Sequence, residues 1–127
     1  ETGGMKGLKK EMPKEVVFDI IHGAFPNAKI YSEYGMTELQ SQFYTDANSL
    51  IFNMNARARV KIMEPNDPFA LQKNNKNGVV NIVDLANAST MPFIATDDIG
   101  VAINQNQFQI LGRLDYADLR GCNLLLQ

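Results

Sequence analysis

The chain has 127 residues, which is enough for one domain with a core of its own. Its formal net charge of -2 gives no electrostatic reason to expect nucleic acid or an anionic membrane surface as the main partner. No apolar run approaches the roughly 20 residues of a membrane-spanning helix, and the single cysteine excludes an internal disulfide, which fits a reducing cytoplasm.

The first predicted element is an amphipathic helix that begins at Pro13, because proline suits the first helical position. Gly23 and Pro26 end this helix, and residues 29–32 predict a buried strand after it. A helix that leads into a strand is typical of an open α/β sheet, whose ligands bind beyond the carboxyl ends of its strands. One apolar face of the helix recurs at helical spacing: Val16, Val17, Ile20, Ile21 and Ala24.

The second half of the chain predicts short strands separated by turns. Residues 57–63 alternate between apolar and basic side chains, as in a half-buried strand, and residues 64–77 predict a long exposed loop because they are rich in Pro, Asn, Asp and Lys. Further strands are predicted at residues 79–85, 93–95, 100–104 and 108–111, the last two forming a hairpin around Gln105 and Asn106.

These elements together predict an α/β (α+β) fold, in which a helix-strand element of an open α/β sheet precedes a small β-barrel-like or sandwich subdomain. Residues 1–40 are expected to be the end of an α/β nucleotide-binding subdomain. Residues 41–127 are expected to be the β-rich subdomain, with a hinge motif towards its C-terminal end.

The first motif with chemical potential is Tyr34-Gly35-Met36-Thr37-Glu38, which follows the predicted strand at residues 29–32. Gly35 lets the backbone turn sharply and approach a ligand. The Thr37 hydroxyl can contact a phosphate, and the Glu38 carboxylate is a hard ligand that suits Mg²⁺. The alternative is an ordinary turn that carries a solvated glutamate.

The second motif is Thr96-Asp97-Asp98, which the sequence predicts to lie between two strands. In extended backbone the two carboxylates alternate sides, so at most one of them points into a given site. A carboxylate there can accept hydrogen bonds from the two hydroxyl groups of a ribose. The alternative is an aspartate pair that caps a turn.

The third motif is Gly112-Arg113-Leu114-Asp115. Arg113 carries a permanent charge on a planar fork that suits phosphate or ribose oxygens. The alternative is a surface pair between Arg113 and Asp115, which would contribute well under about 1 kcal/mol to stability.

In these three ordered motifs the chain resembles the adenylate-forming superfamily, which includes acyl-CoA synthetases, peptide-synthetase adenylation domains and luciferases. The resemblance covers nearly the whole chain, including the upstream Gly3 and Gly4. One departure is Asp97, which stands where the superfamily commonly has the glycine of its TGD motif. Asp98 aligns with the aspartate of that motif.

The resemblance implies that ATP and Mg²⁺ are bound. Tyr34 would stack on adenine, with Gly35 and Met36 beside it, and Glu38 would hold Mg²⁺. Thr37 would contact the α-phosphate.

The resemblance also implies roles for residues outside the first motif. Asp98 would bind the ribose hydroxyls, and Arg113 would reach the ribose or a phosphate. Asp115 would be the hinge before a mobile C-terminal domain. Gly3 and Gly4 would border the adenine or acyl pocket.

Within the superfamily, residues 112–122 look most like acyl-protein synthetases, the fatty-acid-activating partners of bacterial bioluminescence reductases. In that family a cysteine near the C-terminus accepts the acyl group, and Cys122 is the candidate here. The neighbouring Arg113 and Arg120 would lower the pKa of its thiol. The alternative is that Cys122 is simply buried packing ahead of the apolar residues 124–126.

The resemblance further implies that this chain is the last third of a larger cytoplasmic enzyme, because the phosphate-binding loop and the C-terminal catalytic lysine of the superfamily are not found in it. The substrates would be a fatty or aryl carboxylic acid, and an acyl acceptor or reductase would be the protein partner. Apolar surface left by a missing part would favour homo-oligomers. Two rivals remain: a phenylacetate-CoA-ligase-like synthetase that delivers to coenzyme A, and a non-catalytic β-rich interaction module.

Overall fold

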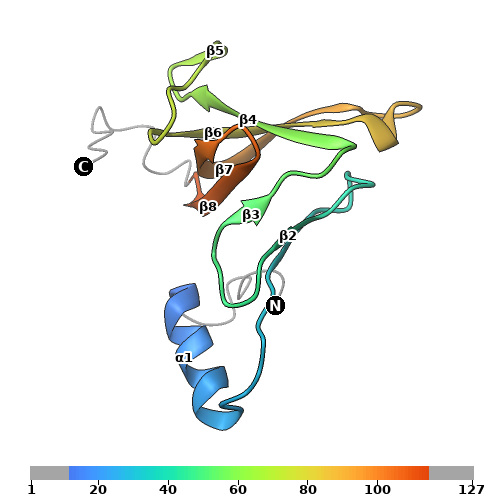
Figure 1. The fold of residues 1–127 in the computed structure, drawn as a ribbon. Coiled ribbons are helices and arrows are strands. Elements are labelled where there is room, and N and C mark those ends of the chain that lie inside the picture. Colours follow the sequence, from blue (N-terminus) through green and yellow to red (C-terminus); the bar gives the residue numbers. More distant parts are fainter. Residues whose placement is uncertain (1–11, 115–127) are drawn as a thin grey trace.

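The computed structural model describes residues 12–114, which form one helix and eight strands (Figure 1). The fold is therefore α+β and is dominated by strands. The elements are α1 (Lys14–Ala24), β1 (Glu33–Tyr34), β2 (Phe43–Thr45), β3 (Phe52–Asn53), β4 (Ala58–Glu64), β5 (Asp67–Leu71), β6 (Asn77–Asp84), the 3-10 turn η1 (Leu85–Asn87), β7 (Phe93–Asn104) and β8 (Gln107–Arg113).

All eight strands belong to one sheet, in the order β1-β2-β3-β8-β7-β6-β4-β5, and every neighbouring pair is antiparallel. The predicted open α/β sheet is not found in the described residues. A parallel pair needs a crossover between its two strands, whereas α1 precedes the first strand and connects no pair. The division of the chain at residue 40 stays a prediction, although β1 lies in the same sheet as the strands that follow it.

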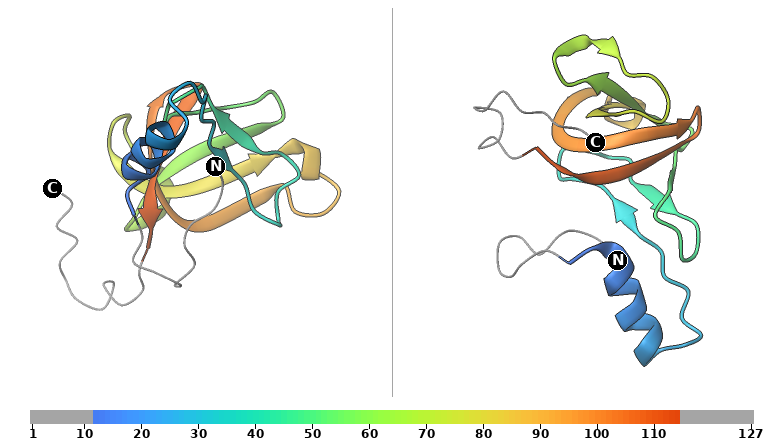
Figure 2. Two further views of the ribbon diagram at one scale, coloured as in Figure 1. Left: turned by 90° about the horizontal axis from the view of Figure 1, so that it is seen from below. Right: turned by 90° about the vertical axis from the view of Figure 1, so that its left-hand side faces the viewer.

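The sheet curves around a single hydrophobic core (Figure 2). In the sheet order β2 and β4 are five positions apart, which is about 24 Å in a flat sheet. Their side chains nevertheless share one cluster, which requires strong curvature. The sheet does not close into the predicted barrel, because β1 and β5 stand at its two ends in the described chain. The cluster comprises Leu39, Phe43, Phe52, Ala58, Val60, Ile62, Val80, Ile82 and Phe108.

Several of the predicted strands are confirmed, namely β4, β6 and the hairpin of β7 with β8 that turns at Gln105 and Asn106. Two predictions are wrong. Residues 64–77 contain β5 in addition to loop, and residues 93–104 form one continuous strand, β7. The polar run of residues 96–98 suggests a loop in the sequence, but in the structure it belongs to β7. It forms a bulge there, because the register with β6 shifts between Val79 and Asn81, while Asp98 pairs with Arg113 on β8.

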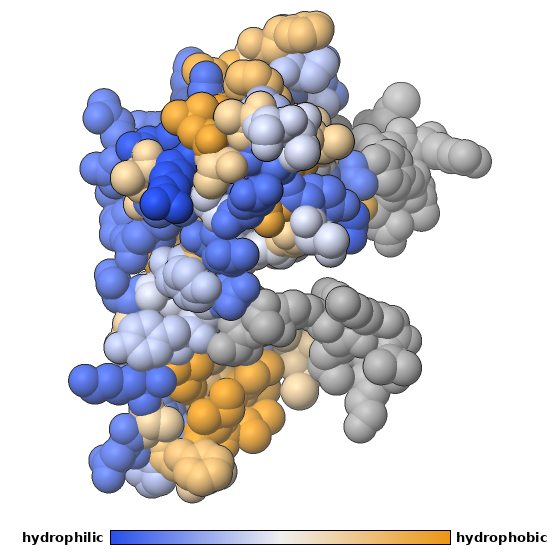
Figure 3. Space-filling view, turned by 90° about the vertical axis from the view of Figure 1, so that its right-hand side faces the viewer, coloured by the Kyte–Doolittle hydropathy of each residue, from blue (hydrophilic) through white to orange (hydrophobic). Residues whose placement is uncertain are grey.

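The predicted helix is confirmed, since α1 begins after Pro13 and ends at Ala24. Its predicted apolar face is not buried by the described residues, because Val16 and Ile20 remain 42% and 57% exposed. Phe18 is the one buried residue of the helix. Apolar side chains gather on the surface at the end of the molecule where α1 lies, so this end carries an exposed apolar face (Figure 3). No helix in residues 12–114 is long and apolar enough to cross a membrane.

The segment after α1 is extended, but the predicted strand at residues 29–32 is wrong by a few residues, because β1 forms at Glu33 and Tyr34. Ile30 and Ser32 are buried, and their carbonyl oxygens accept hydrogen bonds from Asn48 N (2.7 Å) and Thr45 N (3.0 Å). The strand therefore begins where regular pairing with β2 begins, and it includes the first residue of the motif.

The close approach of β6 to β4 at Gly78 yields a prediction for stability. An added Cβ there would lie 2.2 Å from the Met63 carbonyl oxygen and 2.7 Å from Ile62 Cγ2. We expect Gly78→Ala to lower the free energy of unfolding by about 2–3 kcal/mol, because the two strands must move apart. Urea unfolding followed by circular dichroism measures the change.

Gly23 in α1 supplies the matched control, because an added Cβ there meets nothing within 4 Å. Gly23→Ala should raise the free energy of unfolding by about 0.5 kcal/mol, since alanine favours helix. Similar losses for both variants would contradict the assigned packing of β6 on β4.

Candidate functional site

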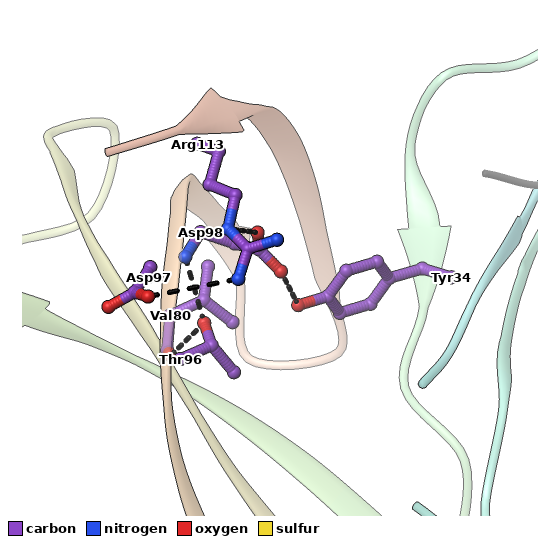
Figure 4. A network of polar contacts seen from close by, with 6 residues as sticks. All are labelled: Tyr34, Val80, Thr96, Asp97, Asp98 and Arg113. Carbon is purple, nitrogen blue, oxygen red and sulfur yellow. Dashed lines mark hydrogen bonds and ion pairs between the residues drawn. The ribbon is translucent and has the colours of Figure 1, made fainter. Parts of the chain in front are cut away.

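The first and second motifs meet through a hydrogen bond between Tyr34 on β1 and Asp98 on β7 (Figure 4). The Tyr34 hydroxyl donates to Asp98 Oδ2 at 2.7 Å. In the sheet order β1 and β7 are four positions apart, or about 19 Å in a flat sheet. The curvature of the sheet therefore brings these two residues together across 64 positions of sequence.

The ring of Tyr34 packs into the aromatic part of the core. Its centroid lies 6.3 Å from that of Phe43, 5.9 Å from that of Phe52 and 6.0 Å from that of Phe108. The pKa of Tyr34 is raised well above its usual range. Burial is the largest cause, and the hydrogen bond to Asp98 is the second. The hydroxyl consequently keeps its proton and donates a hydrogen bond to the carboxylate. Its contribution to stability is present below about pH 10 and is lost as the pH rises towards the raised pKa.

Arg113 from the third motif lies beside both aspartates of the second. Asp98 and Arg113 are directly opposite on β7 and β8. Arg113 Nη2 is 3.7 Å from Asp97 Oδ2, and Arg113 Nε is 4.0 Å from Asp98 Oδ1. Because the Arg113 side chain is 74% exposed, these contacts are loose and screened by solvent. The guanidinium can therefore turn towards an anionic ligand at little cost.

Thr96 fixes the backbone that carries Asp98. Its hydroxyl donates to the Val80 carbonyl oxygen at 2.7 Å and accepts from Asp98 N at 3.1 Å. Leu114 N donates to the Asp97 carbonyl oxygen at 2.7 Å. The second motif is thus held from β6 on one side and from the end of β8 on the other.

The rest of the first motif forms a turn after β1. Thr37, Glu38 and Gly35 are exposed, whereas Met36 is half-buried and packs against the core. Leu39 N donates to the Met36 carbonyl oxygen at 3.1 Å, which closes the turn. An added Cβ at Gly35 would lie 3.2 Å from a side-chain carbon, so a glycine there allows the strand to pass close to its neighbour. The side chains of Thr37 and Glu38 are free to meet a ligand from solvent.

Five residues named in the sequence analysis lie outside the described part of the chain: Gly3, Gly4, Asp115, Arg120 and Cys122. Their roles stay predictions.

Asp84 is a buried residue of this region that the sequence analysis did not single out. It is fully buried at the end of β6. Its Oδ2 accepts from Gln40 N and Ser41 N, both at 2.9 Å, and its Oδ1 accepts from Ser41 Oγ at 2.7 Å and Ala86 N at 3.1 Å. Burial by itself would raise the pKa of Asp84, but these hydrogen bonds outweigh it and hold the pKa below its usual value. An aspartate that ends an apolar strand is the sequence signal for such an anchor.

The described residues do not form a complete metal site by themselves. Residues 12–114 contain no group of three or more His, Cys, Asp or Glu side chains that could hold a metal ion. Mg²⁺ that arrives with a nucleotide needs only one or two carboxylates, because phosphate oxygens and water complete its octahedron. Glu38 offers one such carboxylate, exposed to solvent on a turn whose backbone is anchored.

Comparison with known proteins shows a likeness of fold. No protein-family model matches the chain, and no curated protein matches it. The crystal structure of CmiS6 is similar, with a TM-score of 0.62 and 16% sequence identity over 84% of this chain and 33% of that one. At this identity the likeness extends to the fold alone. The chain spans about a third of the length of CmiS6.

The Tyr34–Asp98 hydrogen bond can be tested by removing one oxygen atom. Tyr34→Phe should lower the free energy of unfolding by about 1–2 kcal/mol, because Asp98 loses a buried donor while the ring packing is kept. Since the raised pKa keeps Tyr34 protonated, the variant should show the same tyrosinate absorbance change on alkaline titration as the wild type. Tyr44, which is 52% exposed, is the control, and Tyr44→Phe should change stability by less than about 0.5 kcal/mol. A smaller titration amplitude for Tyr34→Phe would contradict the assigned environment.

The lowered pKa of Asp84 predicts a dependence of stability on pH. Its contribution is fully present above the unfolded-state value of 3.8 and is lost as the pH falls through the lowered pKa. Asp84→Asn should cost about 2–3 kcal/mol at pH 7, because asparagine keeps only one acceptor oxygen for the four donors that the carboxylate satisfies. The difference from the wild type should shrink below pH 3.8 in urea unfolding. Asp19→Asn, at an exposed position of α1, is the control and should change the free energy of unfolding little at any pH. A difference in the free energy of unfolding between Asp84→Asn and the wild type that stays constant across this pH range would refute the prediction.

Proposed function

We propose that this chain is the C-terminal part of an ATP-dependent enzyme that activates a carboxylic acid as its acyl-adenylate and then passes the acyl group to a thiol. One observation carries the proposal. Residues of three sequence motifs, which the resemblance assigns to one nucleotide, lie within a few ångströms of one another: Tyr34 and Asp98 at 2.7 Å, and Asp98 and Arg113 at 4.0 Å.

Asp98 would accept hydrogen bonds from the ribose hydroxyls of ATP. Its Oδ2 is oriented by Tyr34, and its Oδ1 faces the loosely held Arg113. A carboxylate whose direction is fixed in advance pays less entropy on binding than a mobile one. Arg113, exposed on the same rim, would then take a ribose or phosphate oxygen through its fork. The Tyr34 ring packs against three phenylalanine rings, so adenine would meet only the part of this ring that stays exposed.

Thr37 and Glu38 would interact with the phosphates of ATP and with Mg²⁺. The Thr37 hydroxyl would donate to the α-phosphate, and Glu38 would be a ligand of Mg²⁺. When bound, Mg²⁺ neutralises phosphate charge and helps pyrophosphate to leave. Catalysis by these residues would consist of positioning and charge stabilisation. The attacking group is the carboxylate oxygen of a fatty or aryl acid, which forms a bond to the α-phosphorus as the bond to pyrophosphate breaks.

The acyl group would next move to a thiol, and Cys122 is the candidate within this chain. Its thiolate would attack the acyl carbonyl carbon, so that a thioester forms and AMP leaves with the bonding electrons. Coenzyme A is the acceptor in the rival reaction. An acyl acceptor or reductase would be the protein partner, and the enzyme would act in the cytoplasm.

The proposal is tested in the full-length protein that contains this chain. The assay is ATP–pyrophosphate exchange with Mg²⁺ and a panel of fatty and aryl acids. Asp98→Asn and Glu38→Gln should each lower the exchange rate about 100-fold, because each removes a charged contact made to the nucleotide or its metal. Asp19→Asn, on the outer surface of α1, is the matched control and should retain the wild-type rate.

The fate of the acyl group separates the acceptors. Radiolabelled acid retained on denaturing gels by the wild type and lost in Cys122→Ser would assign the thiol to Cys122. Exchange without retained label would point to coenzyme A or a carrier. Absence of exchange in folded wild-type protein with every acid would refute the proposed function and favour the interaction module, whose binding face would be the exposed apolar side of α1.

A further inference from the structure

Two buried polar residues, Asp84 and Asn87, lie one turn apart where β6 passes into η1. Their side chains reach across 43 to 49 positions of sequence to the turn that carries Thr37 and Glu38. We refer to these two residues as the clamp. Asn87 is 4% exposed and Asp84 is fully buried, so water does not compete for their hydrogen bonds.

Most of the hydrogen bonds of Asp84 go to this distant turn and not to its own. One bond, from Ala86 N at 3.1 Å, caps η1. The other three come from Gln40 N at 2.9 Å, Ser41 N at 2.9 Å and Ser41 Oγ at 2.7 Å. Burying a charged carboxylate costs free energy unless it is well paired. The single bond that caps η1 would not offset this cost, so the three bonds to the distant turn are needed to keep Asp84 buried.

Asn87 holds the backbone of Glu38, the residue proposed above as a ligand of Mg²⁺. Its Nδ2 donates to the Glu38 carbonyl oxygen at 2.8 Å and to the Met91 carbonyl oxygen at 3.1 Å. Its Oδ1 accepts a hydrogen bond from Thr90 Oγ1, which fixes the orientation of the amide. The backbone of Glu38 is thereby fixed from the core side, while its carboxylate extends into solvent.

We propose that Asp84 and Asn87 are positioning residues, which fix the backbone of residues 38–41 and so set where the Glu38 carboxylate meets Mg²⁺. The inference rests on the proposed function. Leu39, between the clamped residues, is buried in the core and provides the third point of attachment. These three attachments fix the point on the backbone from which the Glu38 side chain would reach a ligand.

Asn87→Ala in the full-length protein is the decisive variant. The measurements are the Mg²⁺ concentration that half-saturates ATP binding and the Kd of adenosine without Mg²⁺. The variant should need about tenfold more Mg²⁺, because a carboxylate displaced by a fraction of an ångström loses its geometry. Adenosine affinity should stay within about twofold of wild type, since Tyr34 and Asp98 stand on other strands.

Milder and matched variants guard against a trivial loss of folding. Ser41→Ala removes one hydrogen bond to Asp84 and should shift the Mg²⁺ requirement in the same direction by a smaller factor. Ile82→Val, in the core portion of β6, lowers stability while it keeps every hydrogen bond of the clamp, and it should leave the Mg²⁺ requirement unchanged.

The outcomes separate the two proposals. If Mg²⁺ aids ATP binding in the wild type and Asn87→Ala keeps the wild-type requirement, the clamp is refuted and the proposed function stands. An equal shift in Ile82→Val would also refute it, because the effect would then follow general stability. If Mg²⁺ has no effect on ATP binding in the wild type, both the proposed function and the clamp's role in metal binding fall.

Discussion

The curvature of one antiparallel sheet around a cluster of aromatic rings is the constraint on which the rest of this structure depends. Phe43, Phe52 and Phe108 come from three adjacent strands, and the rings of Phe43 and Phe108 meet edge to face with centroids 5.2 Å apart. The buried aliphatic side chains of β4 and β6 complete the cluster. Burying this much apolar surface favours a sheet that curves until its distant strands share one core. The site at its rim follows from that curvature.

Two carboxylates shape the candidate site on the curved sheet: that of Asp98, which is half-buried, and that of Asp84, which is buried. Asp98 receives the Tyr34 hydroxyl and lies beside Arg113, so its bonding capacity is left partly open at the rim. Asp84 is satisfied by four donors, all from the protein, and is closed to solvent. Because Asp98 and Asp84 differ in burial and in pairing, they suit different roles. The open carboxylate suits a ligand, whereas the closed one suits an anchor for the neighbouring turn.

Several elements of the fold could be predicted from local pattern, because their causes are local. Pro13 and Gly23 stand near the two ends of a stretch in which apolar residues recur at helical spacing. The alternation along β4 is typical of a half-buried strand, and Gln105 with Asn106 indicates a hairpin turn. The continuity of β7 could not be predicted, since residues 96–98 suggest a loop. They stay in the strand as a bulge, which Asp98 joins to Arg113 of β8 and the Thr96 hydroxyl joins to Val80 of β6. The sequence also could not predict that the sheet stays open, because closure depends on whether the strands at its two ends, β1 and β5, pair with each other.

The sequence by itself determined the helix α1, the strands β4 and β6, the turn between β7 and β8, and the order of three motifs, because spacing and residue type act over a few positions of chain. It could not determine that Tyr34 would donate to Asp98, or that Asp84 and Asn87 would hold the backbone beside Glu38. Those contacts join residues 43 to 64 positions apart. Only the tertiary structure decided them, because the free energy that forms them comes from burying one shared core, which no local stretch of sequence contains.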